Sequence, residues 1–214
     1  ANAFGGRAGI NFNGNSHFRV EDANNPLGGK TSFTIAAVFK ATAAGNTGSN
    51  WYQASGLIGG EESGVVNDFG LGWTGDSGGA VKGGAGFAGV GDRTLTSGSQ
   101  TLNAVHAAVL TYNGATGAMT LSVDGVQVAT ATGAAGAARN SATFGLGAMS
   151  TATGATQPFP GVVGELRMYD SVENGPALSR ALLDAYTLPA VANNDTVTMH
   201  RGQKARIDVL ANDT

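Results

Sequence analysis

Residues 103–132, with the sequence NAVHAAVLTYNGATGAMTLSVDGVQVATAT, indicate three β-strands joined by two turns. The positions that alternate as half-buried strands require are Val105, Ala107, Val109 and Thr111, then Met119, Leu121 and Val123, then Val126 and Val128. The pairs Asn113-Gly114 and Asp124-Gly125 are typical of tight hairpins, because glycine has no Cβ to oppose a positive φ angle. The segment therefore predicts a β-meander in an all-β protein whose antiparallel sheets stack face to face.

The composition is that of a folded domain with a substantial core, since 42% of the 214 residues are hydrophobic and only 13% are charged. The 35 glycines have no three-residue period and predict many turns. A formal charge of -3 argues against a nucleic-acid partner. Apolar runs are far shorter than the roughly 20 residues that cross a bilayer, so we expect no membrane insertion. The lack of cysteine excludes disulfides and thiolate chemistry.

Further strand candidates follow one another at short spacing along the chain. They lie at residues 10–12, 17–21, 32–40, 56–58, 69–73, 86–90, 143–146 and 162–169. One helix is favoured at residues 176–186, where Pro176 falls in the first turn and Leu178 and Leu182 share a face. We therefore expect residues 1–188 to form one domain.

Four segments carry a family pattern in a fixed order. They are INFNG at 10–14, FTIAAVF at 33–39, the hairpin at 106–125, and FPGVVGELRMYD at 159–170. Their order resembles the laminin G-like domain of the concanavalin A-like lectin and glucanase superfamily, over residues 1–188. The resemblance implies a two-sheet antiparallel jelly-roll sandwich with one short C-terminal helix. Pentraxin-like relatives bind calcium in the loop before the closing strand, but here residues 150–160 contain no Asp or Glu.

Residues 189–214 differ from the rest and have the pattern of two strands about a polar turn. Two strands alone are marginally stable in water. We expect this strand-forming tail to dock on the main domain, to mediate self-association through residues 191–214, or to begin another domain. Its IDVLANDT at 207–214 resembles the first strand of cadherin-like tandem repeats in large bacterial surface proteins. The two resemblances together imply a secreted module located outside the cell or at its surface.

Two glycine-rich motifs look catalytic but have the wrong context. GDSGG at 75–79 matches the nucleophile loop of trypsin-like serine proteases, yet His17 is the only histidine before it and lacks that family's setting. GGKT at 28–31 resembles the end of a phosphate-binding loop, yet Asn24 stands where the first glycine belongs and a strand follows in place of a helix. Ordinary turns explain both motifs better.

The glucanases of the superfamily make glycosidase activity a further alternative. Such enzymes need two carboxylates that face each other across the sugar, commonly about 5 to 9 Å apart. The chain has no Glu-x-Asp-x-x-Glu strand, and the adjacent Glu61 and Glu62 would point to opposite sides of an extended segment. We therefore expect a protein that is not an enzyme.

Residues 50–92 contain the side chains best suited to bind a sugar. Trp51, Tyr52 and Trp73 offer rings on which sugar C–H faces stack, and Asp68 offers a carboxylate to hydroxyls. The alternating strand around Trp73 favours the core for that ring. Trp51 and Tyr52 follow a polar loop, where exposure and burial are equally expected. These four residues are the predicted ligand-binding residues.

Glu61, Asn67, Asp68 and Asp92 form a candidate metal site in the same region. Calcium takes six to eight oxygen ligands from carboxylates, amides and backbone carbonyls, so calcium is the one candidate cofactor. Asn and Asp are also ordinary turn residues, and a purely structural role is favoured slightly over metal binding.

Three basic side chains are expected to have structural roles. His106 starts a strand of the meander, where a histidine with satisfied hydrogen bonds is the simplest interpretation. Arg139 and Arg167 are expected on solvated faces or at sheet edges, where charge discourages aggregation.

These patterns favour a non-catalytic recognition or adhesion module that binds carbohydrate or another cell-surface ligand through loops at one rim. The alternative is a structural subunit that self-assembles into a filament, a surface layer or a virion and adds its tail as a strand to the next copy. Only the alternative requires residues 191–214, so their deletion distinguishes the two hypotheses. Fold resemblance by itself confers no function.

Overall fold

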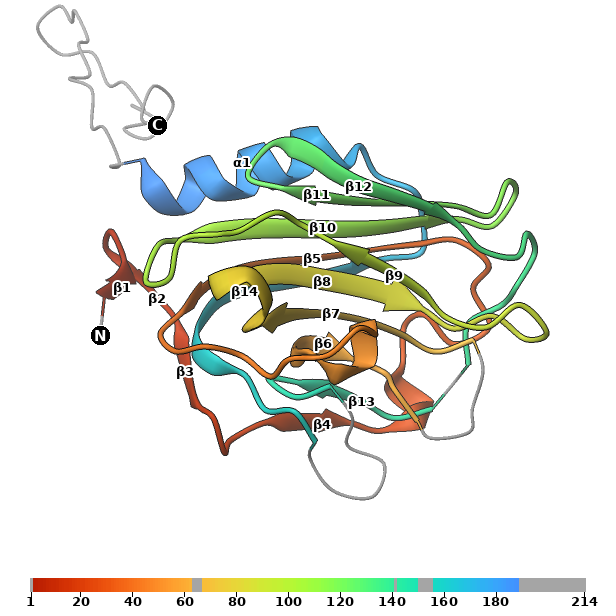
Figure 1. The fold of residues 1–214 in the computed structure, drawn as a ribbon, viewed down its shortest axis with the longest axis horizontal. Coiled ribbons are helices and arrows are strands. Elements are labelled where there is room, and N and C mark those ends of the chain that lie inside the picture. The colour runs from red at the N-terminus through yellow and green to blue at the C-terminus, as the bar shows by residue number, and fades with distance from the viewer. Residues whose placement is uncertain (1, 63–66, 141, 150–155, 189–214) are drawn as a thin grey trace, which may run out of the picture.

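The computed structural model describes residues 2–62, 67–140, 142–149 and 156–188. Within them the chain forms two antiparallel six-stranded sheets, a small two-stranded sheet and one α-helix (Figure 1). The two large sheets stack face to face, which confirms the predicted all-β jelly-roll sandwich. The predictions for residues 189–214, both the strand-forming tail and the cadherin-like repeat, lie outside the described residues.

Each large sheet combines strands from distant parts of the chain. The first sheet has the order β12-β11-β10-β5-β14-β3 and consists of β3 (Ile10–Asn13), β5 (Phe33–Ala41), β10 (His106–Asn113), β11 (Ala118–Val123), β12 (Val126–Thr132) and β14 (Pro160–Tyr169). The second sheet has the order β4-β13-β6-β7-β8-β9 and consists of β4 (Phe18–Val20), β6 (Ser55–Gly59), β7 (Phe69–Thr74), β8 (Ala80–Ala85), β9 (Arg93–Thr96) and β13 (Phe144–Leu146). The smaller elements are β1 (Asn2–Phe4), β2 (Arg7–Ala8), η1 (Asp22–Asn24), η2 (Trp51–Gln53), η3 (Asp76–Gly78) and α1 (Gly175–Thr187).

The main core lies between the two large sheets and is rich in aromatic rings. Its largest buried side chains include Phe33, Phe39, Phe69, Trp73 and Tyr112. Because these rings come from both sheets, burial of their apolar area holds the layers together.

The helix α1 covers the outer face of the first sheet, along β10, β11 and β12 (Figure 1). Asn174 begins the helix by accepting a hydrogen bond from the Ala177 N–H at 3.1 Å. Leu182 and Tyr186 then pack against the outward side chains of the sheet. The helix predicted at residues 176–186 is therefore confirmed.

This helix changes the burial that the sequence predicted for β10. Ala107 and Val109 face α1, whereas Leu110 and Tyr112 face the main core. The expectation of a half-buried strand was wrong because both alternating sets of β10 are apolar, and the helix supplies a second apolar layer.

The two predicted hairpin turns differ in outcome. Asp124 and Gly125 have φ angles of 53° and 91°, as a tight turn requires. At the other hairpin the positive φ of 74° belongs to Gly117, and its N–H bonds the Asn113 carbonyl at 2.7 Å. Gly114 is needed for another reason, since a Cβ there would lie 2.0 Å from the Thr31 carbonyl oxygen.

One predicted strand is wrong. Residues 86–90 form a loop, and the chain is extended on either side of it, in β8 and β9. Strand β8 was not predicted because Lys82, Gly83 and Gly84 interrupt the apolar alternation. These residues are nevertheless buried.

Candidate functional site

Asp68 and Asp92 lie next to one another at the ends of two strands of the second sheet. Asp68 precedes β7 and Asp92 precedes β9. A Cβ placed on Gly86 would lie 2.3 Å from Asp68 Oδ1 and 3.3 Å from Asp92 Oδ1, so both carboxylates flank this glycine. The negative charge of Glu61 also acts on Asp68. The structure thus gathers the predicted metal-binding carboxylates at one end of the sheet.

Burial and charge repulsion make the Asp68 carboxyl a weak acid. Its residue is only 5% exposed. Desolvation, then repulsion by Asp92 and Glu61, raises the pKa of Asp68 to about 7. The guanidinium of Arg139 donates to the Asp68 and Gly86 carbonyl oxygens, at 3.1 and 3.0 Å.

The position of Arg139 corrects the expectation that this residue is solvated. It is 2% exposed, and its guanidinium lies 4.8 Å from the Phe87 ring centroid and 4.9 Å from that of Tyr112. Desolvation lowers the pKa of Arg139 to about 10, so the side chain stays charged at neutral pH. A buried cation next to the Asp68 backbone is therefore part of the core.

The predicted calcium ligands provide charge but not a complete ligand set. No group of three or more His, Asp or Glu in the described ranges is arranged to hold a metal ion. The side-chain oxygen of Asn67 already accepts a hydrogen bond from the Ala88 N–H at 3.1 Å. Since calcium takes six to eight oxygens, the described side chains alone do not make a calcium site.

The two tryptophans among the predicted ligand-binding residues are buried, both at 0% exposure. Trp73 belongs to the core, and its Nε1 donates to the Ala43 carbonyl at 3.2 Å. Trp51 packs on the outer face of the second sheet, where a Cβ on Gly84 would lie 2.5 Å from its ring. The core position that the alternating strand favoured for Trp73 is confirmed, and neither Trp51 nor Trp73 presents a ring face to a sugar.

Tyr52 is the one predicted aromatic ligand that keeps some exposure. Its ring meets that of Trp51 edge to face, with centroids 5.7 Å apart. Its hydroxyl accepts a hydrogen bond from Asn50 Nδ2 at 2.7 Å. Tyr52 thus belongs to the loop between β5 and β6, next to a pocket that the sequence did not reveal.

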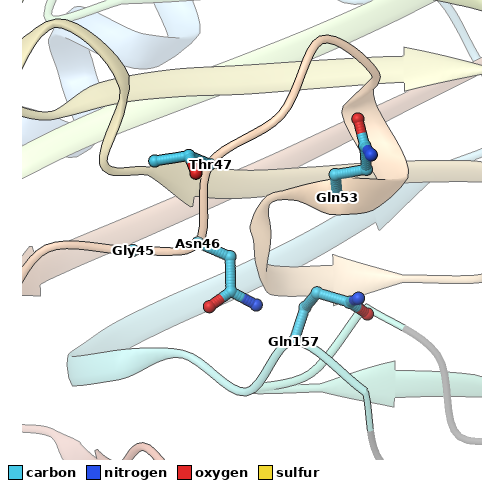
Figure 2. Close-up of a pocket in the computed structure, with 5 residues that line it drawn as sticks. All are labelled: Gly45, Asn46, Thr47, Gln53 and Gln157. Atoms are coloured by element: carbon cyan, nitrogen blue, oxygen red, sulfur yellow. The ribbon is translucent and has the colours of Figure 1, made fainter.

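That pocket, named here the polar pocket, has a volume of about 500 Å³. Gly45, Asn46, Thr47, Gln53 and Gln157 line it (Figure 2). The first four come from the loop between β5 and β6, and Gln157 comes from the segment before β14. The sequence signal for the loop is the polar run GNTGSN at 45–50, but nothing in it pointed to Gln157.

Asn46 and Gln157 extend their amides into the space between the loop and the segment before β14 (Figure 2). Within the part of the chain that the structure describes, neither amide group makes a hydrogen bond. The Gln53 side chain differs, because its Oε1 accepts from the Asn50 N–H at 2.9 Å. Asn46 and Gln157 are therefore the amides free to bind a ligand.

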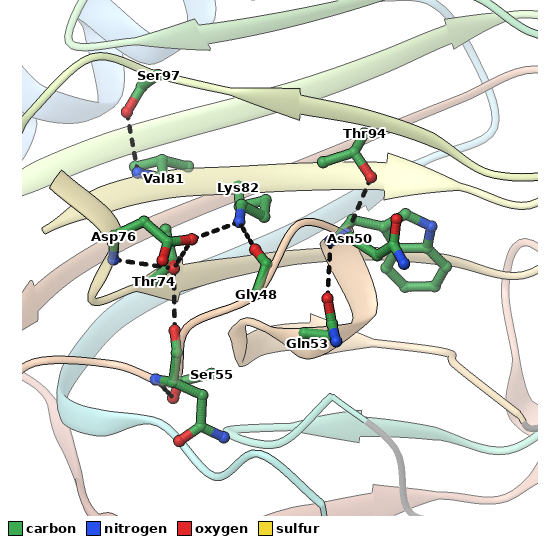
Figure 3. A network of polar contacts seen from close by, with 12 residues as sticks. Gly48, Asn50, Gln53, Ser55, Thr74, Asp76, Val81, Lys82, Thr94 and Ser97 are labelled. Atoms are coloured by element: carbon green, nitrogen blue, oxygen red, sulfur yellow. Dashed lines mark hydrogen bonds and ion pairs between the residues drawn. The ribbon is translucent and has the colours of Figure 1, made fainter.

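A network of polar contacts fixes the loop that carries the pocket (Figure 3). Lys82, on β8 beneath the loop, pairs with Asp76 Oδ2 at 2.7 Å and donates to the Gly48 carbonyl. The hydrogen bond from Lys82, followed by that from Thr74, lowers the pKa of Asp76. The Asn46 N–H donates to Ser55 Oγ at 3.1 Å. The pocket thus has a rigid wall before any ligand arrives.

The motifs that look catalytic lie in turns. Ser77 of the GDSGG motif is in η3, and among the described residues no histidine hydrogen-bonds to it. His106 instead places Nδ1 2.7 Å from Asp124 Oδ2 and Nε2 2.8 Å from the Thr101 carbonyl oxygen. Both nitrogens face acceptors, which makes the doubly protonated ring the natural state and confirms the structural role expected of His106.

The sequence from residue 12 to residue 177 matches a laminin G family model described as the concanavalin A-like lectin/glucanases superfamily. The chain belongs to this superfamily. No curated protein sequence matches it. The superfamily match ends before residue 189, so the cadherin-like continuation remains a prediction.

Solved structures of superfamily-like domains share the fold at low identity. The CBM40 domain of the Ruminococcus gnavus IT-sialidase, bound to α2,3-sialyllactose, is 16% identical, with a TM-score of 0.62 over 81% of this chain and 96% of that chain. A heptameric SAP-like pentraxin from Limulus polyphemus is 13% identical, with a TM-score of 0.61 and coverage of 85% and 84%. Domains LG4-5 of the mouse laminin α1 chain are 19% identical, with a TM-score of 0.57 and coverage of 78% and 42%.

In the described part of the chain, no helix is long and apolar enough to span a membrane.

Replacement of Lys82 by Met should lower the free energy of unfolding by about 1–3 kcal/mol, because it leaves the Gly48 carbonyl and Asp76 without their buried partner. Lys30→Met is the matched control, since Lys30 pairs with Asp170 at an exposed site and little change is expected. Urea unfolding measures both variants. Equal stability of the two variants would contradict the structural role of Lys82.

The His106 pair should make stability fall as pH rises above the unfolded histidine pKa of about 6.5. Burial alone lowers the pKa of His106, but the hydrogen bonds to Asp124 and the Thr101 carbonyl outweigh it, and the net pKa is raised. The stabilisation is fully present below the unfolded value of about 6.5 and is lost as pH rises through the folded value. Urea unfolding between pH 6 and 9 should show a larger loss in the wild type than in His106→Gln, because the raised pKa of Asp68 contributes the same fall to both proteins. Parallel curves for the two proteins would refute it.

Proposed function

We propose that the chain is a non-catalytic recognition module of an extracellular protein, and that it binds carbohydrate or a similar surface ligand through the polar pocket. The observation that carries the proposal is a pocket of about 500 Å³ lined by two free amides, Asn46 on the loop between β5 and β6 and Gln157 on the segment before β14. This volume is within the range of small-molecule sites, and amides bond sugar hydroxyls as donors and as acceptors. The CBM40 neighbour, named as bound to sialyllactose, lends support by its shared fold.

The non-catalytic part of the proposal is supported by what lines the polar pocket. Asn, Thr and Gln side chains line it, and none of these is a general acid or base. The neighbouring carboxylates Asp68 and Asp92 do not line this pocket, and Asp68 is buried. A glycosidase would need its two carboxylates on either side of the bound sugar.

Glycan-array binding and isothermal titration of the full chain test the recognition function. The double variant Asn46→Ala, Gln157→Ala should weaken binding about five-fold or more, because each lost hydrogen bond is worth about 0.5–1.5 kcal/mol. Gln127→Ala, on the exposed surface of β12, is the control and should bind as the wild type does. Full binding by the double variant would refute the pocket assignment.

The assembly alternative predicts a different result for a chain that ends at Leu188. If residues 191–214 add a strand to the next copy, oligomers of the full chain should disappear on truncation, as light scattering after gel filtration would show. The recognition module should keep its affinity for glycan in the truncated form.

We propose calcium as a second ligand, with the Asp68–Asp92 pair and Glu61 supplying the negative charge and Asn67 a further oxygen. Because a ligand bound only by the folded chain stabilises it by mass action, saturating calcium should raise the unfolding midpoint relative to chelator. Asp92→Asn should abolish that rise, whereas Asp22→Asn, at an exposed site in η1, should leave it unchanged. Identical midpoints of the wild type in calcium and in chelator would rule out calcium binding.

A further inference from the structure

We infer that the polar pocket selects an uncharged saccharide and recognises two neighbouring hydroxyls on it, and that it discriminates against sialylated and other acidic glycans. This inference rests on the proposed function and adds the ligand class. It separates this chain from the CBM40 neighbour, which is named as bound to sialyllactose despite the shared fold.

The charges around the pocket carry the first part of the inference. Its lining contains two glutamines, an asparagine, a threonine and a glycine, and therefore no ionisable side chain. Lys82, which binds the loop from β8, is only 3% exposed and is paired with Asp76 beneath the loop. A carboxylate that entered the pocket would lose water without gaining a cation, and an unpaired charge is costly to desolvate.

The amide pair carries the second part. A side-chain amide offers two donors on nitrogen and an acceptor on oxygen. Neighbouring hydroxyls of a sugar each donate one hydrogen bond and accept others, so two amides in one space complement such a pair. Asn46 and Gln157 come from separate segments and line the same pocket (Figure 2).

The backbone of Gln157 shows that its position is imposed by the fold. Its φ angle is 46°, in the left-handed region that residues with a side chain rarely adopt. Its carbonyl oxygen accepts the Gly56 N–H at 2.9 Å, which ties this strained residue to β6. Glycine would adopt this conformation at less cost, so the side chain is there in spite of the backbone preference.

A paired glycan array tests the ligand class. It carries lactose beside α2,3- and α2,6-sialyllactose, together with neutral and acidic polysaccharides, and titration measures every glycan that binds. We expect the bound set to be neutral, with any sialylated counterpart at least ten-fold weaker. An acidic glycan that binds as tightly as its neutral counterpart, or more tightly, would overturn the inference and leave the recognition function standing. Binding of no glycan at all would instead overturn the proposed function, and the inference with it.

Gln157→Gly provides the second test, with the tightest neutral glycan from the array as the probe. The variant should lose about two- to ten-fold in affinity, as one lost hydrogen bond implies, while its thermal midpoint stays equal or rises, because glycine relieves the left-handed φ. A purely structural role for the side chain predicts the reverse, a lower midpoint with unchanged affinity, and that result would overturn the inference. Gln127→Ala again serves as the matched control for affinity.

Discussion

The contact between Trp51 and the glycines of the second sheet determines where this molecule can meet a ligand. Gly70 and Gly84 leave the outer face of that sheet bare, and the indole ring takes the space that side chains would occupy. Because the ring packs on the sheet, the segment between β5 and β6 lies against it, and Lys82 on β8 stabilises this segment from the side of the sheet. The polar pocket exists because that segment is seated there. An aromatic ring that looked like a sugar platform is in fact the anchor of the site.

Buried charge is handled in three different ways within this one domain. Lys82 has a carboxylate partner and a backbone oxygen, so its charge is compensated in place. Arg139 forms no ion pair with a carboxylate among the described residues and relies on carbonyl oxygens and the faces of Phe87 and Tyr112. Asp68 has repulsive neighbours, and its carboxyl responds by holding its proton up to about neutral pH. The neighbours of each group, more than its burial alone, determine whether its charge is paired, solvated by carbonyl oxygens and rings, or neutralised by a proton.

The periodic parts of the sequence predicted the fold well. They did not predict those parts of the site that depend on residues far apart in the sequence. The three strands of the meander, the Asp124-Gly125 turn and the proline-led helix were predicted from short-range signals, and the structure confirms their positions. β8 was missed because Lys82 and its glycine neighbours break the apolar alternation, yet a loop covers them. Gln157 was not predicted as a site residue because it lines the same pocket as Asn46 only after several intervening strands have folded. No local sequence pattern indicates that two distant segments will line one pocket. The burial of Trp51 was not predicted for the same reason, because it depends on glycines far away in the sequence.

The cover that α1 provides has a consequence for how such a domain diversifies. With the helix packed on the outer face of the first sheet, changes on that side disturb the hydrophobic packing that holds the layers. The segment between β5 and β6 is different, because Gly45 and Gly48 pack closely against Trp73 and Gln53 while Asn46 and Thr47 contribute to no core cluster. Combinatorial libraries restricted to such positions would explore new specificities on an unchanged scaffold, much as antibody loops do on theirs.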